Sequence, residues 1–185
     1  KIEKKLGYPC FVKPANAGSS VGITKAHNKE ELMEGLKVAA VHDSKIVVEE
    51  GIVGREIECA VLGNRGHVEA SCVGEIFSAG EFYDYDAKYN NAESKTVVPA
   101  EISPEKQDEI RKMAVKVFNA VDGSGLARVD FFVENETENV IFNELNTLPG
   151  FTPISMYSML WAACGKSTAE LLDNLIELAI ERFSL

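Results

Sequence analysis

The alternation of hydrophobic and polar residues predicts three short strands and one helix within the first 50 residues. Apolar or β-branched runs predict the strands at 10–13, 21–25 and 45–50. Asn28, followed three residues later by Glu31, is a typical helix start, and this helix is expected to end near His42.

Beyond residue 54 the pattern predicts further strands and then helices. Two long runs around a Gly-Asn-Arg-Gly turn predict a hairpin, and two shorter runs surround a second polar turn, which gives strands at 56–62, 67–77, 126–133 and 140–145. Helices are expected at 103–121, 155–164 and 168–183, the last with a Ser167/Glu170 capping box. Strands and helices do not alternate regularly, so we predict an α+β fold.

Composition and charge narrow the class of protein. The chain has 185 residues, 45% hydrophobic and 26% charged, which is typical of a soluble globular protein. Its net charge of −10 disfavours binding to nucleic acid or to an anionic membrane, although a few cations focused in one cleft could still hold a small polyanion. The four cysteines form no C-x-x-C pair and lie in apolar runs, so neither a zinc site nor a disulfide framework is expected. Free cysteines are typical of a reducing compartment, which predicts a cytoplasmic location. The chain begins at Lys1 rather than Met, so we expect a piece of a longer protein.

Two neighbouring strands near the end carry the clearest candidate chemistry. Arg128 and Asp130 are two residues apart and share one strand face, as do Glu144 and Asn146. Strands joined by a short turn are expected to pair, which would bring the four side chains onto one surface. Carboxylate and amide oxygens are the ligands that Mg²⁺ or Mn²⁺ prefers. A solvated strand face with an Arg–Asp pair explains the same pattern, and periodicity alone does not separate the two.

Lys13 ends the first strand and is followed by Pro14 and a Gly-Ser-Ser-Val-Gly loop at 18–22. Such a loop can hold phosphates through the lysine charge and through backbone N–H groups. The P-loop motif is absent, and Gly/Ser loops between strands are usually only turns.

Two further groups are weaker candidates for ligand binding. Glu49 and Glu56 flank a glycine-containing segment and could hold ribose hydroxyls or an adenine amino group, or could be solvated charges. Residues 78–94 form a long loop in which Lys88 lies among aromatic residues. A loop of this length is often a lid, although an aromatic loop packed on the surface is an alternative.

Together these segments resemble the D-alanine–D-alanine ligase family of ATP-grasp enzymes. The matching segments follow the family's order and are FVKP at 11–14, GSSVG at 18–22, FYDYDAKY at 82–89, ARVD at 127–130 and NELNTLPGFT at 143–152. The resemblance implies an ATP-grasp fold, with two lobes of mainly antiparallel sheet and packed helices that clamp ATP. Residues 1–53 would form part of the central nucleotide lobe, and residues 54–185 the C-terminal lobe with the metal site and a mobile loop. An N-terminal lobe would be absent from this chain.

The resemblance also assigns roles to individual residues. Those expected to bind ATP are Lys13, Gly18, Ser19, Ser20, Glu49, Glu56 and Lys88. Those expected to bind two Mg²⁺ or Mn²⁺ ions are Asp130, Glu144 and Asn146. Arg128 and the Gly150 N–H would steady the tetrahedral intermediate, and Ser155, with Gly150, would bind the second D-alanine. Ser19 and Tyr89 would belong to a hydrogen-bonded trio whose third member, a Glu, lies outside this chain.

The activity implied is ATP-dependent joining of two D-alanines through an acyl phosphate, for peptidoglycan precursors, by a cytoplasmic homodimer. Alternatives are ligases that join D-alanine to D-serine or D-lactate, another ATP-grasp carboxylate–amine ligase, or a nucleotide-binding module without catalysis. Tyr89 favours the dipeptide-forming members, because D-lactate enzymes tend to have His in this loop. The chain alone is expected to be inactive, since the first D-alanine site and one phosphate-binding lysine would lie outside it.

Overall fold

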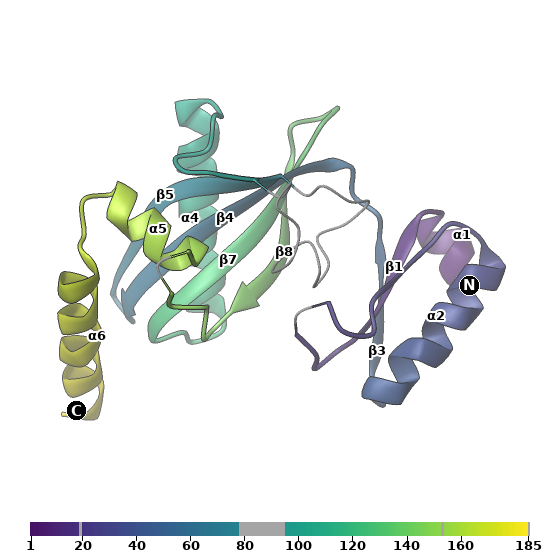
Figure 1. The fold of residues 1–185 in the computed structure, drawn as a ribbon, viewed down its shortest axis with the longest axis horizontal. Coiled ribbons are helices and arrows are strands. Elements are labelled where there is room, and N and C mark those ends of the chain that lie inside the picture. Colours follow the sequence, from purple (N-terminus) through teal and green to yellow (C-terminus); the bar gives the residue numbers. More distant parts are fainter. Residues whose placement is uncertain (19, 78–94, 153, 185) are drawn as a thin grey trace. The chain divides into compact units, whose positions relative to one another are not determined.

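The computed structural model describes residues 1–18, 20–77, 95–152 and 154–184. Within these ranges the chain divides into two compact units, the first formed by residues 1–53 and the second by residues 54–77 and 95–184. Figure 1 shows the elements of both units.

The first unit is a small antiparallel sheet covered by one helix. Its elements are α1 (Ile2–Leu6), β1 (Cys10–Pro14), β2 (Thr24–Ala26), α2 (Lys29–His42) and β3 (Ile46–Glu50). The strand order is β2-β1-β3, so β1 is central. The core consists of the apolar side chains that β1, β2 and α2 turn toward one another, namely Cys10, Val12, Ala26, Leu32 and Ala39.

The start of α2 is capped as predicted, with one difference in detail. Oδ1 of Asn28 accepts a hydrogen bond from the backbone N–H of Glu31 at 2.9 Å. The Glu31 carboxylate accepts from the backbone N–H of His27 at 2.9 Å, one residue before the N-cap. The predicted helix start is therefore confirmed, while the reciprocal bond reaches the residue before the cap.

The second unit contains a five-stranded antiparallel sheet of order β6-β5-β4-β7-β8. Its strands are β4 (Gly54–Asn64), β5 (His67–Phe77), β6 (Lys95–Val97), β7 (Gly125–Glu134) and β8 (Val140–Asn146). Its helices are α4 (Pro104–Ala120), α5 (Met156–Ala163) and α6 (Thr168–Phe183). The predicted hairpin, the Pro104 helix start and the Ser167/Glu170 capping box are all confirmed.

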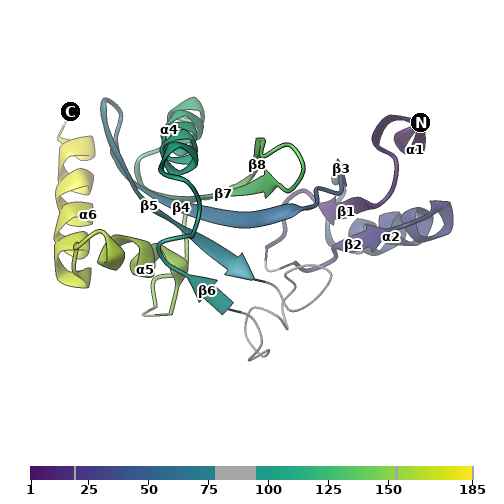
Figure 2. The same cartoon turned by 90° about the horizontal axis from the view of Figure 1, so that it is seen from above.

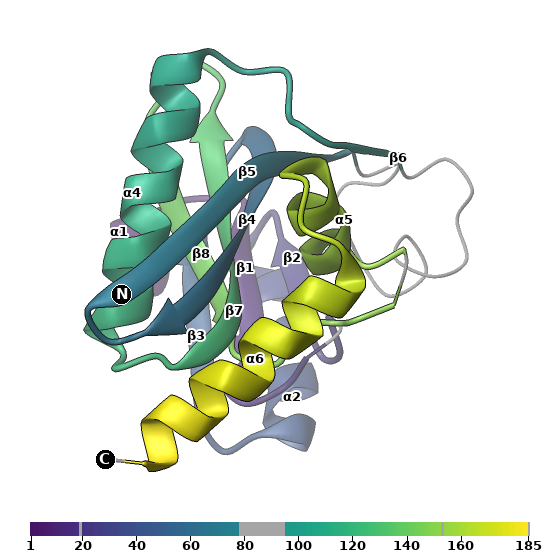
Figure 3. The ribbon, with the colours of Figure 1, turned by 90° about the vertical axis from the view of Figure 1, so that its left-hand side faces the viewer.

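Helices cover this sheet on both faces, as Figures 2 and 3 show. On one face α4 packs against the larger core, which includes Ile57, Val73, Val129, Phe131, Ile110, Ala114 and Phe118. On the other face α5 lies so close to β5 that a Cβ added at Gly74 would meet Sδ of Met156 at 2.6 Å. Charged side chains of β4, β7 and β8 also lie on this second face.

A bulge in β8 sets which face each of its side chains takes. Phe142 pairs with Phe131 and Glu144 pairs with Asp130, so Asn143 is an extra residue without a partner in β7. Phe142 turns toward the α4 face, where its ring meets Phe131 edge-on with centroids 6.2 Å apart. The extra residue lets Glu144, which has the same parity as Phe142, point to the opposite face.

Two features of the first 100 residues differ from the sequence-based prediction. The second strand begins at Thr24 instead of Val21, because the segment before it makes turns in which Val21 donates to the Gly18 carbonyl at 3.2 Å. Gly22 has φ of +75° and lies against the His42 ring, which favours glycine over any side chain. The short elements α1 and β6 were not predicted.

No helix in the described parts of the chain combines the length and the apolar character that crossing a membrane would require.

Candidate functional site

Charged side chains from three adjacent strands meet on the sheet face opposite α4. Strand register places Glu58 of β4 beside Asp130 of β7, and Asp130 beside Glu144 of β8. We call these three residues the acidic row. Arg128 and Asn146 are paired in the next position along β7 and β8. The predicted grouping of Arg128, Asp130, Glu144 and Asn146 on one face is therefore confirmed.

Arg128 is held between two carboxylates of the acidic row. Its Nε donates to Oδ1 of Asp130 at 2.8 Å and its Nη2 donates to Oδ2 at 2.7 Å, which is a bidentate pair. The same Nε lies 3.1 Å from Oε2 of Glu58. Glu58 is 6% exposed and Asp130 7% exposed, so the guanidinium compensates two carboxylates that are largely shielded from water.

Electrostatics keep Arg128 positively charged. Burial lowers its pKa, but the hydrogen bonds to Asp130 and the charges of Glu58, Asp130 and Glu144 raise it by more. The net shift of the Arg128 pKa is upward, so the guanidinium stays protonated at any working pH. Within the described residues, Nη1 has no protein acceptor, which leaves that nitrogen able to donate to a ligand.

The donor set around Asp130 suits a hard divalent cation. Nδ2 of Asn146 donates to Oδ2 of Asp130 at 2.9 Å and to Oε1 of Glu144 at 3.3 Å, so all three side chains converge. A half-turn of the Asn146 amide would aim its oxygen at the same point. Across the described ranges no three His, Cys, Asp or Glu side chains cluster as metal ligands. A Mg²⁺ ion bound here would therefore take its other ligands from water or from a bound molecule.

Glu58 was not singled out by the sequence analysis. Its neighbours from Ile57 to Leu62 are otherwise apolar, so the sequence predicts a buried strand there and gives little reason to single out one glutamate. In the structure, all seven residues from Ile57 to Gly63 are buried. The spacing of two between Glu56 and Glu58, in a strand whose other residues are mostly apolar, was the available signal. The same spacing places Glu56, the predicted ribose contact, on the face that carries the acidic row.

Gly150 and Ser155 approach each other at the start of α5. A Cβ added at Gly150 would meet Oγ of Ser155 at 2.8 Å, so only glycine allows this contact. Ser155 is the N-cap of α5, but its side chain makes no capping bond. Its Oγ instead accepts a hydrogen bond from the backbone N–H of Thr152 at 3.1 Å, which fixes the hydroxyl beside Gly150.

The first unit brings together two of the predicted nucleotide contacts. Nζ of Lys13 lies 2.5 Å from Oε2 of Glu49, on the sheet face that points away from α2. Strand register also places Lys25 beside Phe11 and on that face, which the sequence analysis did not consider. This face therefore carries two lysines and one carboxylate, with Lys13 and Glu49 in an ion pair.

The loop that carries Gly18 and Ser20 adds backbone donors to this unit. Gly18 is exposed and Ser20 has φ of +59°. Successive N–H groups in such a turn can form a concave anion site. Three predicted site residues, Ser19, Lys88 and Tyr89, lie outside the described residues.

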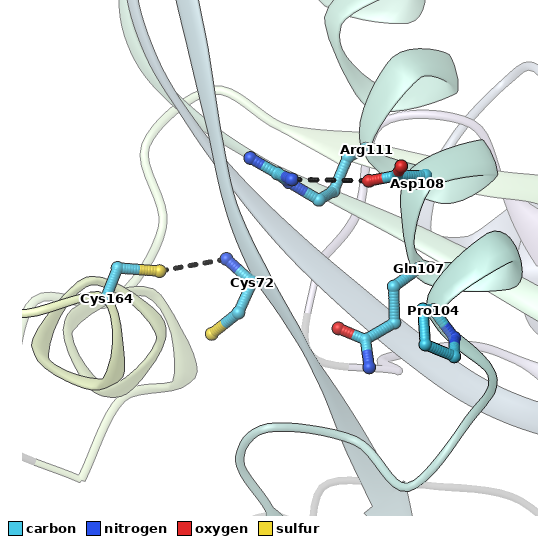
Figure 4. A pocket seen from close by; sticks show the side chains of 6 residues that line it. All are labelled: Cys72, Pro104, Gln107, Asp108, Arg111 and Cys164. Carbon is cyan, nitrogen blue, oxygen red and sulfur yellow. Dashed lines mark hydrogen bonds and ion pairs between the residues drawn. The ribbon is translucent and has the colours of Figure 1, made fainter.

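A separate pocket of about 330 Å³ lies between the ends of α4 and α5, and its lining shares no residue with the acidic row. Figure 4 shows Cys72 on its strand, with Cys164 on one side and Arg111 and Gln107 on the other. The backbone N–H of Cys72 donates to Sγ of Cys164 at 3.0 Å. Burial raises the pKa of Cys72 to about 12, so this thiol is not a ready nucleophile.

Solved structures define the class of fold. The D-Ala:D-Ser ligase VanG of Enterococcus faecalis matches 96% of this chain and 51% of its own chain, with a TM-score of 0.86 and 42% identity. The D-alanine-D-alanine ligase of Coxiella burnetii matches 95% of this chain and 46% of its own, with a TM-score of 0.83 and 40% identity. The predicted α+β fold of the ATP-grasp class is thereby confirmed.

Sequence comparison identifies the family within that class. Residues 1–177 match the family described as "D-ala D-ala ligase C-terminus", and the chain belongs to it. The D-alanine--D-alanine ligase of Acetivibrio thermocellus is 58% identical over 184 residues, covering 100% of this chain and 49% of its own length. The chain thus spans about half the length of the curated relatives that it matches.

Proposed function

We propose that the whole protein of which this chain forms about half is an ATP-dependent ligase that joins two D-alanines for peptidoglycan precursors. The observation that carries the proposal is the convergence of Arg128, Asp130, Glu144 and Asn146 on one sheet face in a member of this family. The relatives named D-alanine--D-alanine ligase are 53–58% identical to this chain, which supports the same substrate.

The sheet face that carries the acidic row would bind the divalent cation. Asp130, Glu144 and Asn146 would supply oxygen ligands for Mg²⁺ or Mn²⁺, and we propose that two ions bind. When bound, the metal would neutralise the phosphate charge and polarise the transferring phosphoryl group. The hydrogen bonds from Nδ2 of Asn146 to both carboxylates, at 2.9 Å and 3.3 Å, support this assignment, because one small group lies within reach of the other two proposed ligands.

Each unit carries some of the residues that we propose as contacts for ATP. Lys13 would contact the phosphates, with backbone N–H groups of the loop containing Gly18, Ser19 and Ser20. Glu49 would contact the adenine and Glu56 the ribose, while Lys88 would reach the γ-phosphate. The ion pair between Lys13 and Glu49 supports the first part, because it places these two proposed contacts side by side. Residues 1–53 and 54–185 would then be the nucleotide lobe and the metal-binding lobe.

The reaction needs two displacements, each of which concentrates negative charge. A carboxylate oxygen of the first D-alanine attacks the γ-phosphorus and ADP leaves, which gives an acyl phosphate. The amine of the second D-alanine attacks the acyl carbon, loses a proton and expels phosphate. Arg128 and the Gly150 N–H would donate to the oxyanion of the second step. Ser155 would hold the carboxylate of the second D-alanine, and Ser19 and Tyr89 would help to align it.

A D-Ala–D-Ser ligase is the second candidate. The observation that favours it is the likeness to the D-Ala:D-Ser ligase of Enterococcus faecalis, at 42% identity and a TM-score of 0.86. We further propose that the whole protein acts as a homodimer in the cytoplasm.

A phosphate-release assay on the full-length protein, with ATP, Mg²⁺ and one of three second substrates, tests these proposals. We expect D-alanine alone to support release, with one phosphate per dipeptide. Faster phosphate release when D-serine or D-lactate is added to D-alanine would mean that the added compound, and not D-alanine, is the preferred second substrate. ATP hydrolysis that is independent of any amino acid would contradict the ligase assignment itself.

A further inference from the structure

We propose that Glu58 is a positioning residue that holds the Arg128 guanidinium in place independently of the metal. This inference rests on the proposed function, in which Arg128 acts on the substrate and Asp130 binds a cation. Glu58 belongs to none of the proposed contacts with ATP, metal or D-alanine.

The geometry separates the two carboxylates that hold Arg128. Asp130 makes the bidentate hydrogen-bonded pair with Nε and Nη2. Oε2 of Glu58 approaches Nε from the neighbouring strand at 3.1 Å, as an ion pair without a hydrogen bond. A cation bound at Asp130 would compete with the guanidinium for the same two oxygens. Glu58 lies on the far side of Asp130 from Glu144 in the acidic row, so its carboxylate can keep its contact with Nε while Asp130 serves the cation.

Burial makes Glu58 an effective anchor. The side chain is 8% exposed and the Arg128 side chain 19% exposed, so their interaction is little screened by water. The backbone of Glu58 is fixed on both sides, because β4 pairs with β5 and with β7 at this position. A carboxylate that is rigid and dry restricts where the guanidinium can point, which is what a group that must meet a developing oxyanion requires.

The structure also provides a matched control. Glu75 is 2% exposed and holds Arg55 through two contacts, of 2.6 Å from Nε and 2.5 Å from Nη2. Glu75 pairs with Ile57, a residue of the α4 core, and so lies on the opposite face of the same sheet. A change at Glu75 therefore loosens an arginine pair with a buried carboxylate without touching Arg128.

The kinetic test compares Glu58→Gln and Glu75→Gln in the full-length protein with D-alanine and MgATP. We expect Glu58→Gln to lower kcat by about tenfold to a hundredfold while KM for MgATP changes little, because misplacement of a catalytic group mainly affects the transition state. Glu75→Gln should lower the melting temperature comparably and keep kcat. In an Arg128→Lys background, Glu58→Gln should add little further loss. Losses that multiply instead would show that Glu58 acts independently of Arg128.

A second measurement does not depend on the ligase activity. With ¹⁵N-arginine labelling, the Nε–H signal of Arg128, identified by its loss in Arg128→Lys, should exchange slowly with water both with and without Mg²⁺. In Glu58→Gln it should exchange faster, most clearly with Mg²⁺, whereas in Glu75→Gln it should not change. If the wild type releases no phosphate, the proposed function fails, and this signal still decides the role of Glu58.

Glu58→Asp keeps the charge on a shorter side chain and provides a second variant if Glu58→Gln does not fold. We expect it to shift kcat and the Nε–H exchange in the same direction by a smaller factor. An unchanged kcat together with an unchanged Arg128 signal in either folded variant would overturn the proposal.

Discussion

Asp130 and Glu144 face each other directly across β7 and β8, and the extra residue of the bulge, Asn143, comes immediately before Glu144. The two carboxylates have different surroundings. Asp130 is 7% exposed and paired with Arg128, whereas Glu144 is exposed and contacts Nδ2 of Asn146. Removing the charge of Glu144 should therefore affect ligand binding far more than stability.

We predict that Glu144→Gln in the full-length protein abolishes phosphate release and leaves the fold intact. Loss of one carboxylate from the proposed two-metal site removes charge stabilisation worth several kcal/mol, on the order of a thousandfold or more in rate. Phosphate release and circular dichroism melts on the same samples would check this. Glu136→Gln, on the exposed turn between the same two strands, is the control and should be active. Activity near that of wild type in Glu144→Gln would mean that Glu144 binds no catalytic metal.

Arg128→Ala should destabilise the second unit strongly. It leaves Glu58 and Asp130 buried without their shared counter-charge, and breaking such a pair costs about 3–5 kcal/mol. Urea unfolding would measure the loss. Because a cation between the carboxylates would replace part of the missing charge, millimolar Mg²⁺ should recover more stability in the variant than in wild type. Equal effects of Mg²⁺ on both proteins would argue against cation binding at Asp130.

We predict that the four cysteines differ sharply in their rates of alkylation. Cys164 is exposed, whereas Cys10 and Cys59 are fully buried. Burial raises the pKa of Cys59 to about 12, and that of Cys72 to the same value. Iodoacetamide at pH 8, followed by mass spectrometry, should therefore label Cys164 first and Cys10 and Cys59 only after unfolding. Rapid labelling of Cys59 in the native chain would contradict its placement in the core.

The start of α6 should make a pH-dependent contribution to stability. Hydrogen bonds from the Ser167 hydroxyl and backbone N–H lower the pKa of Glu170 below its ordinary value. The contribution is therefore fully present above the ordinary pKa of a glutamate and is lost as the pH falls through the lowered value. Thermal melts between pH 3 and pH 7 should show a smaller pH dependence in Glu170→Gln than in Glu177→Gln, an exposed change in the middle of the same helix. Identical pH profiles would rule out the capping contribution.

The 185-residue chain alone should bind MgATP weakly and form no dipeptide. It carries the proposed cation ligands and ribose contact, but the proposed site of the first D-alanine lies outside it. Holding two reactants in attacking geometry can be worth roughly 7–11 kcal/mol, and we propose that the whole protein is needed for it. Calorimetric titration with MgATP and a dipeptide assay on the same sample would check both parts. Dipeptide formed by residues 1–185 alone would refute this division of roles.

The sequence predicted most of this architecture because its local signals were strong. Ser103-Pro104 and the Ser167/Glu170 capping box mark helix starts, and the alternation in β7 placed Arg128 and Asp130 on one face. Short elements such as α1 and β6 were missed, because α1 has no side-chain cap and β6 has three residues. Elements that short carry too little pattern to be distinguished from loops.

Within the site, the two missed features both depend on tertiary pairing. Glu58 was hidden in a buried apolar run, and only the register of β4 against β7 shows that it faces Asp130. The bulge has a trace in the sequence, since the apolar residues of β8 that face α4 change from a spacing of two (Val140, Phe142) to a spacing of three (Leu145). A change from a spacing of two to a spacing of three is therefore the signal by which the sequence indicates the bulge.

The bulge also makes the site residues contribute to folding specificity. A regular ladder that paired Asn143 with Asp130 would slip Glu144 and Asn146 onto the α4 face and turn Leu145 away from it. That competing register would bury a carboxylate and an amide in an apolar core and expose a leucine, so it is strongly disfavoured. The side chains that we assign to cation binding therefore also select the correct one of two strand alignments as the sheet forms.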